Sequence, residues 1–264
     1  MVWTLYKVEL YKMVKRPAAR FSILIFAALV AFSSAFLYHA SQTNVNFYFG
    51  FPNAWDLIFI NISMPVSIFA SVMVILLVAN EFDWRTSRQN IIDGMSRREW
   101  FMAKLTLLPT IVLLLYIPLL IYDVTLAWLG TDPSIENAFA ITRTQYLAFV
   151  GTIIGVLCYV SVALLFAMLA RTAGAALGIT ILYPFIDDRI SQTLRGFGLE
   201  NTADCFPFEV VKGLFNYAQY FPDGSVRRGW TVAEWDTPVL FAAGIGWITM
   251  FLIISWLLYN KRDL

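Results

Sequence analysis

Long apolar runs constrain the fold of this chain more than any other feature. Of its 264 residues, 59% are hydrophobic and 14% are charged, whereas soluble globular domains average roughly 45–50% and 25%. The apolar residues gather into runs of 18 to 25 residues that lack a two-residue alternation. Runs of about 20 residues cross the hydrocarbon core of a bilayer as α-helices, and the missing alternation excludes a membrane β-barrel. The sequence therefore predicts an all-α integral membrane protein.

Six transmembrane helices are expected, in a single membrane domain over 1–264. They cover 21–40, 57–79, 105–128, 146–170, 172–190 and 238–259. The apolar stretch 146–190 is too long for one crossing at 1.5 Å per residue, so we divide it at Arg171.

Two longer connections join these helices. Segment 80–104 lies between the second and third spans, and segment 191–237 lies between the fifth and sixth. Within the latter, 206–221 is apolar but short, and Asp204 and Pro207 suit a helix start, which predicts a short helix beside the membrane.

The positions of Lys and Arg predict the orientation. With six spans, 13 of the 19 basic residues fall on the side that carries both termini and segment 80–104. Basic residues concentrate in cytoplasmic connections, so we expect both termini in the cytoplasm. In 1–20, Tyr6, Leu10 and Met13 recur at helical spacing opposite several lysines. This pattern favours an amphipathic helix on the inner membrane surface over an ordinary basic flank.

The sequence offers little for catalysis, cofactors or metals. His39 is the only histidine, which excludes paired haem ligands and a zinc-protease helix. Cys158 lies in a span and Cys205 in a polar loop, so we expect no bond between them. A net charge of +1 gives no indication of nucleic-acid binding. No G-x-x-x-x-G-K-[ST] loop occurs, so we predict no ATPase site in this chain; any ATP-driven work would need another polypeptide.

A few positions inside the spans could carry function. Asp123 and Asp187 lie near the predicted outer ends of their helices, where they either meet water or line a substrate path. Glycines four residues apart, as at Gly151 and Gly155 or Gly174 and Gly178, would permit close helix packing.

Residues 81–104 form a charged island between two apolar runs. This island holds nine of the 37 charged side chains in 24 residues, interleaved with aromatic residues. It cannot enter lipid, so it lies at the membrane surface and faces the adjacent water. If another molecule drives this protein, we expect the contact here.

The island resembles the signature stretch of type-2 ABC exporter permeases. In that family a Glu ends the second span and a Thr follows. An amphipathic segment then leads to Gly or Pro, to Ser-Arg, and to a Lys that opens the third span. Here those positions are Glu81, Thr86, Ile91, Ile92, Gly94, Ser96, Arg97 and Lys104. This sequence departs from the pattern at Arg85, where a Gly often precedes the Thr, and at Gly94-Met95, which replaces a frequent Pro-Val.

The resemblance implies a mechanism and partners. It implies six spans, an N-terminal interfacial helix, and a coupling helix in 80–104 that docks on a separate cytoplasmic ATPase. ATP and Mg would bind that partner, and a second permease chain, identical or related, would complete the complex in lipid, in a bacterial inner membrane. The coupling residues would be Glu81, Arg85, Thr86, Arg88, Ile91, Ile92, Gly94, Ser96, Arg97, Arg98 and Lys104.

Two finer expectations concern the island's contacts. Its aromatic and aliphatic residues would anchor the partner; these are Phe82, Trp84, Ile91, Ile92, Trp100 and Phe101. Glu81 and Asp83 would tether the island to the N-terminal helix through Lys12 or Lys15.

Two alternative functions stay open: a non-transporting membrane anchor or regulatory subunit of an ATPase-linked assembly, and an intramembrane enzyme that uses Asp123 and Asp187.

Overall fold

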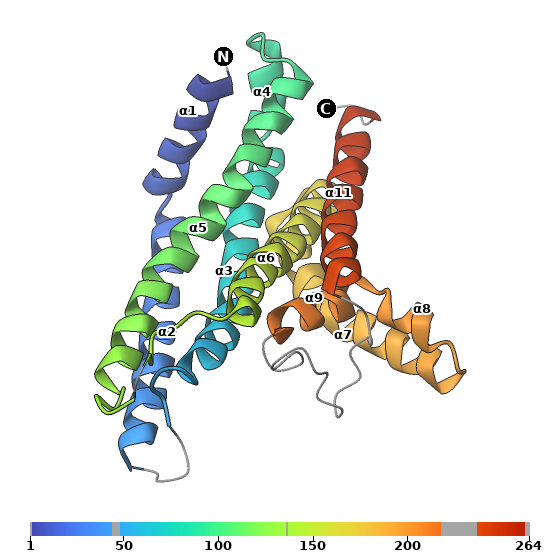
Figure 1. Cartoon of the computed structure of the whole chain (residues 1–264). Coiled ribbons are helices and arrows are strands. Elements are labelled where there is room, and N and C mark those ends of the chain that lie inside the picture. The colour runs from blue at the N-terminus through green and yellow to red at the C-terminus, as the bar shows by residue number, and fades with distance from the viewer. Residues whose placement is uncertain (1, 44–47, 136, 218–236, 262–264) are drawn as a thin grey trace.

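A computed structural model of the chain describes residues 2–43, 48–135, 137–217 and 237–261, and every regular element within them is a helix. The helices are α1 (Val2–Lys15), α2 (Pro17–Thr43), α3 (Ala54–Asp83), α4 (Thr86–Ile92), α5 (Arg97–Leu129), α6 (Arg143–Ala170), α7 (Ala173–Gly196), α8 (Glu200–Asp204), α9 (Pro207–Phe215) and α11 (Thr237–Lys261). In Figure 1, α2, α3 and α5 run side by side, and α7, α9 and α11 lie to the right of them. The predicted all-α fold is confirmed.

Five of these helices are long and apolar enough to cross a membrane: α2, α3, α5, α6 and α11. Each contains one predicted span and extends beyond it. The stretch 172–190 also forms a helix, α7, but it is not in this set, since Asp187, Asp188 and Arg189 interrupt its apolar run. The predicted division is confirmed, because α6 ends at Ala170 and α7 begins at Ala173.

The centre of the bundle is formed by α3 and α6, which pack extensively against each other. In their most apolar stretches 67% and 61% of the residues are buried, against 17% in α2. Most of the apolar surface of α2 is therefore exposed on this chain, including Phe21, Leu29 and Phe32. Burial distinguishes central from peripheral helices although all are apolar.

The N-terminal helix, α4 and the C-terminal end of α11 lie at one end of the bundle, which we call the α4 end (Figure 1). The predicted N-terminal helix is present, and a break at Arg16 precedes Pro17. It packs along α5, and it buries Glu9 and Met13. This helix is thus a packed part of the bundle and not only a peripheral element.

The short helix α9 packs against α6 and α11 at the opposite end. A Cβ atom added at Gly155 would lie 2.5 Å from the ring of Phe215, and one at Gly151 would lie 3.2 Å from the carbonyl oxygen of Leu214. The glycines of α6 therefore make room for α9. Gly174 and Gly178 of α7 have no neighbour within 4 Å of such a Cβ, so the expectation of close packing holds for the first pair alone.

Candidate functional site

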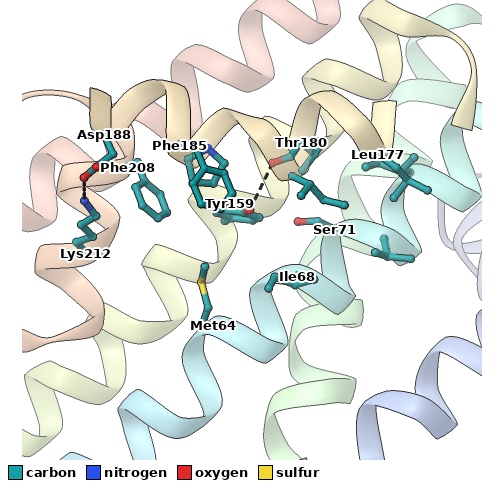
Figure 2. A pocket seen from close by; sticks show the side chains of 14 residues that line it. Met64, Ile68, Ser71, Tyr159, Leu177, Thr180, Phe185, Asp188, Phe208 and Lys212 are labelled. Atoms are coloured by element: carbon teal, nitrogen blue, oxygen red, sulfur yellow. Dashed lines mark hydrogen bonds and ion pairs between the residues drawn. The ribbon is translucent and has the colours of Figure 1, made fainter. Parts of the chain in front are cut away.

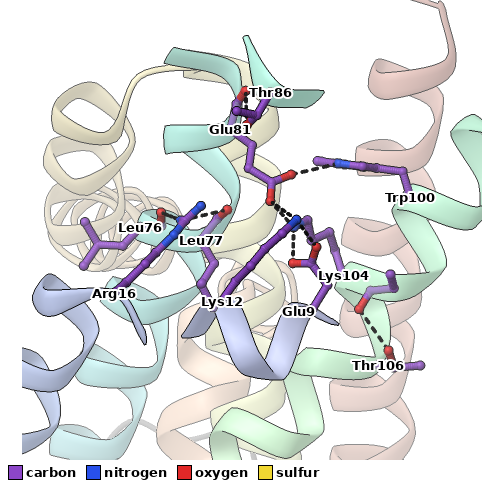
Figure 3. Close-up of polar contacts among 11 residues, drawn as sticks. Glu9, Lys12, Arg16, Leu76, Leu77, Glu81, Thr86, Trp100, Lys104 and Thr106 are labelled. Carbon is purple, nitrogen blue, oxygen red and sulfur yellow. Dashed lines mark hydrogen bonds and ion pairs between the residues drawn. The ribbon is translucent and has the colours of Figure 1, made fainter. Parts of the chain in front are cut away.

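Four charged side chains from three helices meet at the α4 end, and we call them the charge cluster (Figure 3). They are Glu9 and Lys12 of α1, Glu81 of α3 and Lys104 of α5. The Nζ atom of Lys104 contacts Glu9 and lies 2.7 Å from Oε1 of Glu81. Lys12 Nζ lies 2.7 Å from Glu9 and 3.3 Å from Glu81. The cluster joins the N-terminal helix to both helices that flank α4.

Helical spacing explains this convergence. Glu9 and Lys12 are three residues apart on α1, and Trp100 and Lys104 are four apart on α5, so each pair shares a helix face. The indole Nε1 of Trp100 donates a 2.9 Å hydrogen bond to the second carboxylate oxygen of Glu81. Both oxygens of Glu81 are therefore engaged, and its charge is buried with partners.

The cluster is electrically balanced, with two carboxylates and two ammonium groups. Glu81 and Lys104 are 1% and 2% exposed. Burial by itself lowers the pKa of Lys12, but the carboxylates of Glu81 and Glu9 outweigh it and raise the pKa above its usual value. Since removal of one partner from a buried pair costs about 3–5 kcal/mol, all four charges depend on one another.

The start of α5 is fixed by a capping box. The Ser96 hydroxyl accepts a hydrogen bond from the Glu99 backbone N–H, and the Glu99 carboxylate accepts one from the Ser96 backbone N–H. Gly94 precedes it with a φ of 102°, a conformation that glycine adopts without strain. The positive φ of this turn therefore accounts for a glycine at position 94, where a proline is frequent in the family that the island resembles. The S-x-x-E pattern at 96–99 already indicates this helix start.

Further polar contacts tie the helices of the α4 end together. Arg16 donates a 2.7 Å hydrogen bond to the backbone carbonyl of Leu76 in α3. Arg97 donates to the carbonyl of Asn260 at 2.7 Å, which links the start of α5 to the end of α11. Thr86 donates to the carbonyl of Glu81 at 3.3 Å. These bonds join the α1–α2 break to α3, α5 to α11, and α4 to α3 at this end of the bundle.

The expected tether between the island and the N-terminal helix is confirmed for Glu81 and Lys12. The expectation for Asp83 is wrong: its carboxylate accepts a hydrogen bond from the Ala173 backbone N–H at 3.3 Å. The roles of Glu9 and Lys104 in this cluster were not foreseen. For Glu9, the i, i+3 spacing from Lys12 is a sequence signal that could have indicated an ion pair on one face of the helix.

Several residues expected to contact a partner point into the protein instead. Trp100 and Phe101 are 1% and 4% exposed, and the Trp100 ring stacks on Tyr259 at 4.5 Å. These two are therefore not available to anchor a partner protein, and the side chains of Glu81 and Lys104 are buried as well. Of the island residues that we expected to contact a partner, those that remain exposed are Trp84, Arg85, Thr86, Arg88, Ile92, Gly94, Ser96 and Arg98. Phe82, Ile91 and Arg97 are half-buried.

Asp123 is fully buried, so the expected solvation at a helix end is wrong for this residue. Its Oδ2 accepts a 3.2 Å hydrogen bond from Asn61 of α3, and the same amide donates to Ser34 of α2 at 3.0 Å. Three helices thus share a polar cluster inside an apolar bundle. This arrangement links α2, α3 and α5 and is not a helix end in water.

Asp187 is also buried, at 2% exposure, and it accepts a 3.1 Å hydrogen bond from the backbone N–H of Phe208. It therefore accepts a hydrogen bond from one of the backbone N–H groups in the first turn of α9 that have no partner within the helix. The sequence led us to expect this role for Asp204. Asp204 instead pairs with Arg195 at 2.7 Å. Asp123 and Asp187 occupy different polar clusters, and neither belongs to the groove described next.

An apolar groove of about 440 Å³ runs between α3 and α7 (Figure 2). Met64, Ile68, Leu177 and Phe185 line its sides. Lys212 and Asp188 form an ion pair at one end, with 2.5 Å between Nζ and Oδ1. Its surface is apolar along the helices and charged at this one end.

The fold and the charge cluster define a helical membrane protein whose N-terminal helix is tied into the bundle by buried ion pairs. A family model described as "Protein of unknown function (DUF2705)" matches residues 23–264. The chain belongs to this family, because the match covers most of its length. A comparison with curated proteins finds no match.

Proposed function

We propose that this chain is the membrane-spanning permease subunit of an ATP-driven exporter, and that a separate ATPase binds at its α4 end. The charge cluster is the observation that carries the proposal. It joins α1, α3 and α5 directly beside α4, so a displacement of α4 by a bound partner would be transmitted to helices that cross the membrane. The likeness of residues 81–104 to type-2 ABC exporter permeases adds to this argument.

The docking face in this proposal is the exposed tip of the island. Ile92 is 67% exposed, and Arg98 is exposed at the first turn of α5. An exposed aliphatic residue beside guanidinium groups suits a partner surface with an apolar cleft and carboxylates. Glu81 and Lys104 act in this proposal by holding the tip in position and not by contact.

The proposal includes α7 as a sixth crossing. After α6 the chain is back at the α4 end, and α11 also finishes there, because its Asn260 carbonyl accepts a hydrogen bond from Arg97. In this proposal α7, with 24 residues, makes the further crossing that leads from the end of α6 to the start of α11. Its uninterrupted apolar part, 173–186, spans roughly 21 Å. Beyond it, Asp188 pairs with Lys212 of α9, and Arg195 pairs with Asp204 of α8.

The orientation follows from the basic residues. With the α4 end in the cytoplasm, most Lys and Arg lie on the cytoplasmic side, as the positive-inside rule requires. ATP and Mg would then bind the partner on that side. The apolar groove between α3 and α7 is the surface that an apolar cargo would contact, in place of Asp123 and Asp187.

Association with an ATPase tests the proposal. The affinity-tagged chain should copurify with an ATPase encoded by another gene, and Ile92→Asp should reduce this association by about tenfold or more, since the charge enters the apolar contact. Ile141→Asp is the matched control, because Ile141 is 62% exposed at the opposite end. If Glu81→Ala with Arg97→Ala left complex assembly and ATP-coupled transport unchanged, the role of the α4 end would be refuted.

A non-transporting anchor or regulatory subunit is the second candidate, because the same charge cluster would serve it equally. Flux separates the two. Reconstituted complex that hydrolyses ATP but moves no member of a broad cargo panel supports the anchor, whereas ATP-dependent accumulation of any member supports the exporter.

A further inference from the structure

A second cavity lies at the α4 end, between the α3–α4 junction and the corner that joins α6 to α7. Its volume is about 330 Å³. The residues around it are Glu81, Phe82, Arg85, Ser87, Arg88 and Arg171. We call it the arginine cavity, since three guanidinium side chains from two separate corners of the fold line one small space.

The charge of the arginine cavity is positive. Glu81 is its one acidic wall residue, and the carboxylate of Glu81 is already bound by Lys12, Lys104 and Trp100. The nearby Asp83 accepts a hydrogen bond from the Ala173 backbone. Among the described residues no carboxylate forms an ion pair with Arg85 or Arg88. An anion would therefore meet several guanidinium groups and little repulsion.

The backbone holds two of these arginines in an uncommon conformation. Arg85 has a φ of 56° and Arg171 a φ of 59°, in the left-handed region that is strained for a non-glycine residue. Each stands at a corner where one helix ends and another begins, where glycine would be less costly. Both corners nevertheless carry an arginine that lines the same cavity.

The arginine cavity sits where two long apolar helices, α3 and α6, reach their ends at the α4 end. If these helices cross the membrane, their ends are where lipid headgroups would lie. Trp84, next to Arg85, is 64% exposed, and Arg16 lies 5.5 Å from its ring. Exposed tryptophan and arginine side chains mark the boundary between hydrocarbon and water in membrane proteins.

We propose that the arginine cavity binds the phosphate group of an anionic phospholipid. A guanidinium group presents two parallel N–H donors that match the oxygens of a phosphate, and three such groups converge here. Ser87 also lines the cavity, but its hydroxyl is buried, so the proposal depends on the three arginines. The bound headgroup would bridge α4 and the α6–α7 corner.

This site is centred elsewhere than the proposed ATPase contact, although Arg85 and Arg88 are also among the expected coupling residues. That contact is centred on Ile92 and Arg98, whereas the arginine cavity lies between the α3–α4 junction and the α6–α7 corner. Lipid binding is measured on the purified chain alone, so its failure and the failure of the exporter proposal are separate results.

Native mass spectrometry of the delipidated chain tests the proposal. We expect the wild-type protein to retain phosphatidylglycerol in preference to phosphatidylcholine. Arg88→Gln with Arg171→Gln should weaken phosphatidylglycerol binding by about tenfold or more, because two charge-assisted contacts are lost. Arg98→Gln is the matched control, since it removes the same charge at the same end but outside the cavity. Arg88→Gln alone, at an exposed position, should give an intermediate loss.

A second arm identifies the source of the phosphate group. Millimolar inorganic phosphate that displaces the lipid from the wild type would show that the cavity also takes free phosphate; no displacement would restrict the site to lipid. Equal losses for the double variant and Arg98→Gln, or no preference between the two lipids, would overturn the proposal. So would a double variant that keeps phosphatidylglycerol but loses a copurified ATPase, since the arginines would then bind partner carboxylates. Thermal unfolding midpoints confirm that each variant is folded.

Discussion

The ammonium group of Lys104 lies 2.7 Å from a carboxylate oxygen of Glu81, and both side chains are almost completely buried. This pair connects the end of α3 to the start of α5 and thereby closes the segment that carries α4. Glu9 and Lys12 add the N-terminal helix to the same cluster. The exposed part of the island is thus held between α3 and α5 by a buried cluster of two carboxylates and two ammonium groups.

Loss of Lys104 should therefore destabilise the protein strongly. Lys104→Met is expected to lower the free energy of unfolding by about 3–5 kcal/mol, because Glu81 and Glu9 lose their shared cation. Adding Glu81→Gln should cost much less than it costs alone. Denaturant titrations of the purified protein measure this cycle, with Arg98→Gln as an exposed control. Strictly additive effects would contradict the coupling.

The packing of α9 against α6 should be sensitive to the addition of a single methyl group on α6. Gly155→Ala is expected to destabilise by about 1–3 kcal/mol, because the new Cβ meets the Phe215 ring at 2.5 Å. Gly178→Ala provides the matched control: its Cβ meets nothing within 4 Å, so better helix propensity should make it neutral or stabilising. Unfolding midpoints of the two variants compare them directly. Equal shifts of the unfolding midpoint in both variants would argue against close packing between α6 and α9.

Native cysteines report the orientation. Cys205 is exposed at the end opposite α4, whereas Cys158 is buried in α6. With the α4 end in the cytoplasm, a membrane-impermeant maleimide should label intact cells at Cys205 and leave Cys158 unlabelled. Cys205→Ala should abolish the signal. Labelling of Cys205 that appears only after the cells are opened would reverse the proposed orientation.

Arg85→Gly should separate stability from anion binding. Glycine relieves the left-handed strain at φ 56°, which should stabilise the protein by up to about 1 kcal/mol after the greater freedom of the unfolded chain is subtracted. The same change removes one guanidinium group from the arginine cavity, so phosphatidylglycerol binding should weaken. Unfolding and lipid titrations on one sample measure both. A variant that is less stable would show that Arg85 makes contacts worth more than the strain.

Local features of the sequence were readable in advance. The apolar runs correspond to α2, α3, α5, α6 and α11, and the break at Arg171 separates α6 from α7. Arg85 stands where the type-2 ABC exporter permeases that the island resembles often have glycine, and its φ of 56° is a conformation that glycine adopts without strain. These features depend on residues that are close together in the chain, so they can be predicted from the sequence alone.

Side-chain burial at the island was predicted less well. Trp100 and Phe101 were expected to contact a partner, but they pack on Tyr259 and Trp256 from the far end of the chain. Helical periodicity shows which residues share a face, but it does not show which other helix covers that face. The burial of Asp123 beside Asn61 and Ser34 has the same origin.

The sequence by itself determined a helical membrane protein, since runs of about 20 apolar residues have no other stable arrangement in lipid. It also determined that the charged island lies outside the hydrocarbon core. Only the tertiary structure decided that Glu9, Lys12, Glu81 and Lys104 meet, because they are separated by up to 95 residues in the chain. Buried charges require partners within a few ångströms, and those distances are set by how α1, α3 and α5 pack.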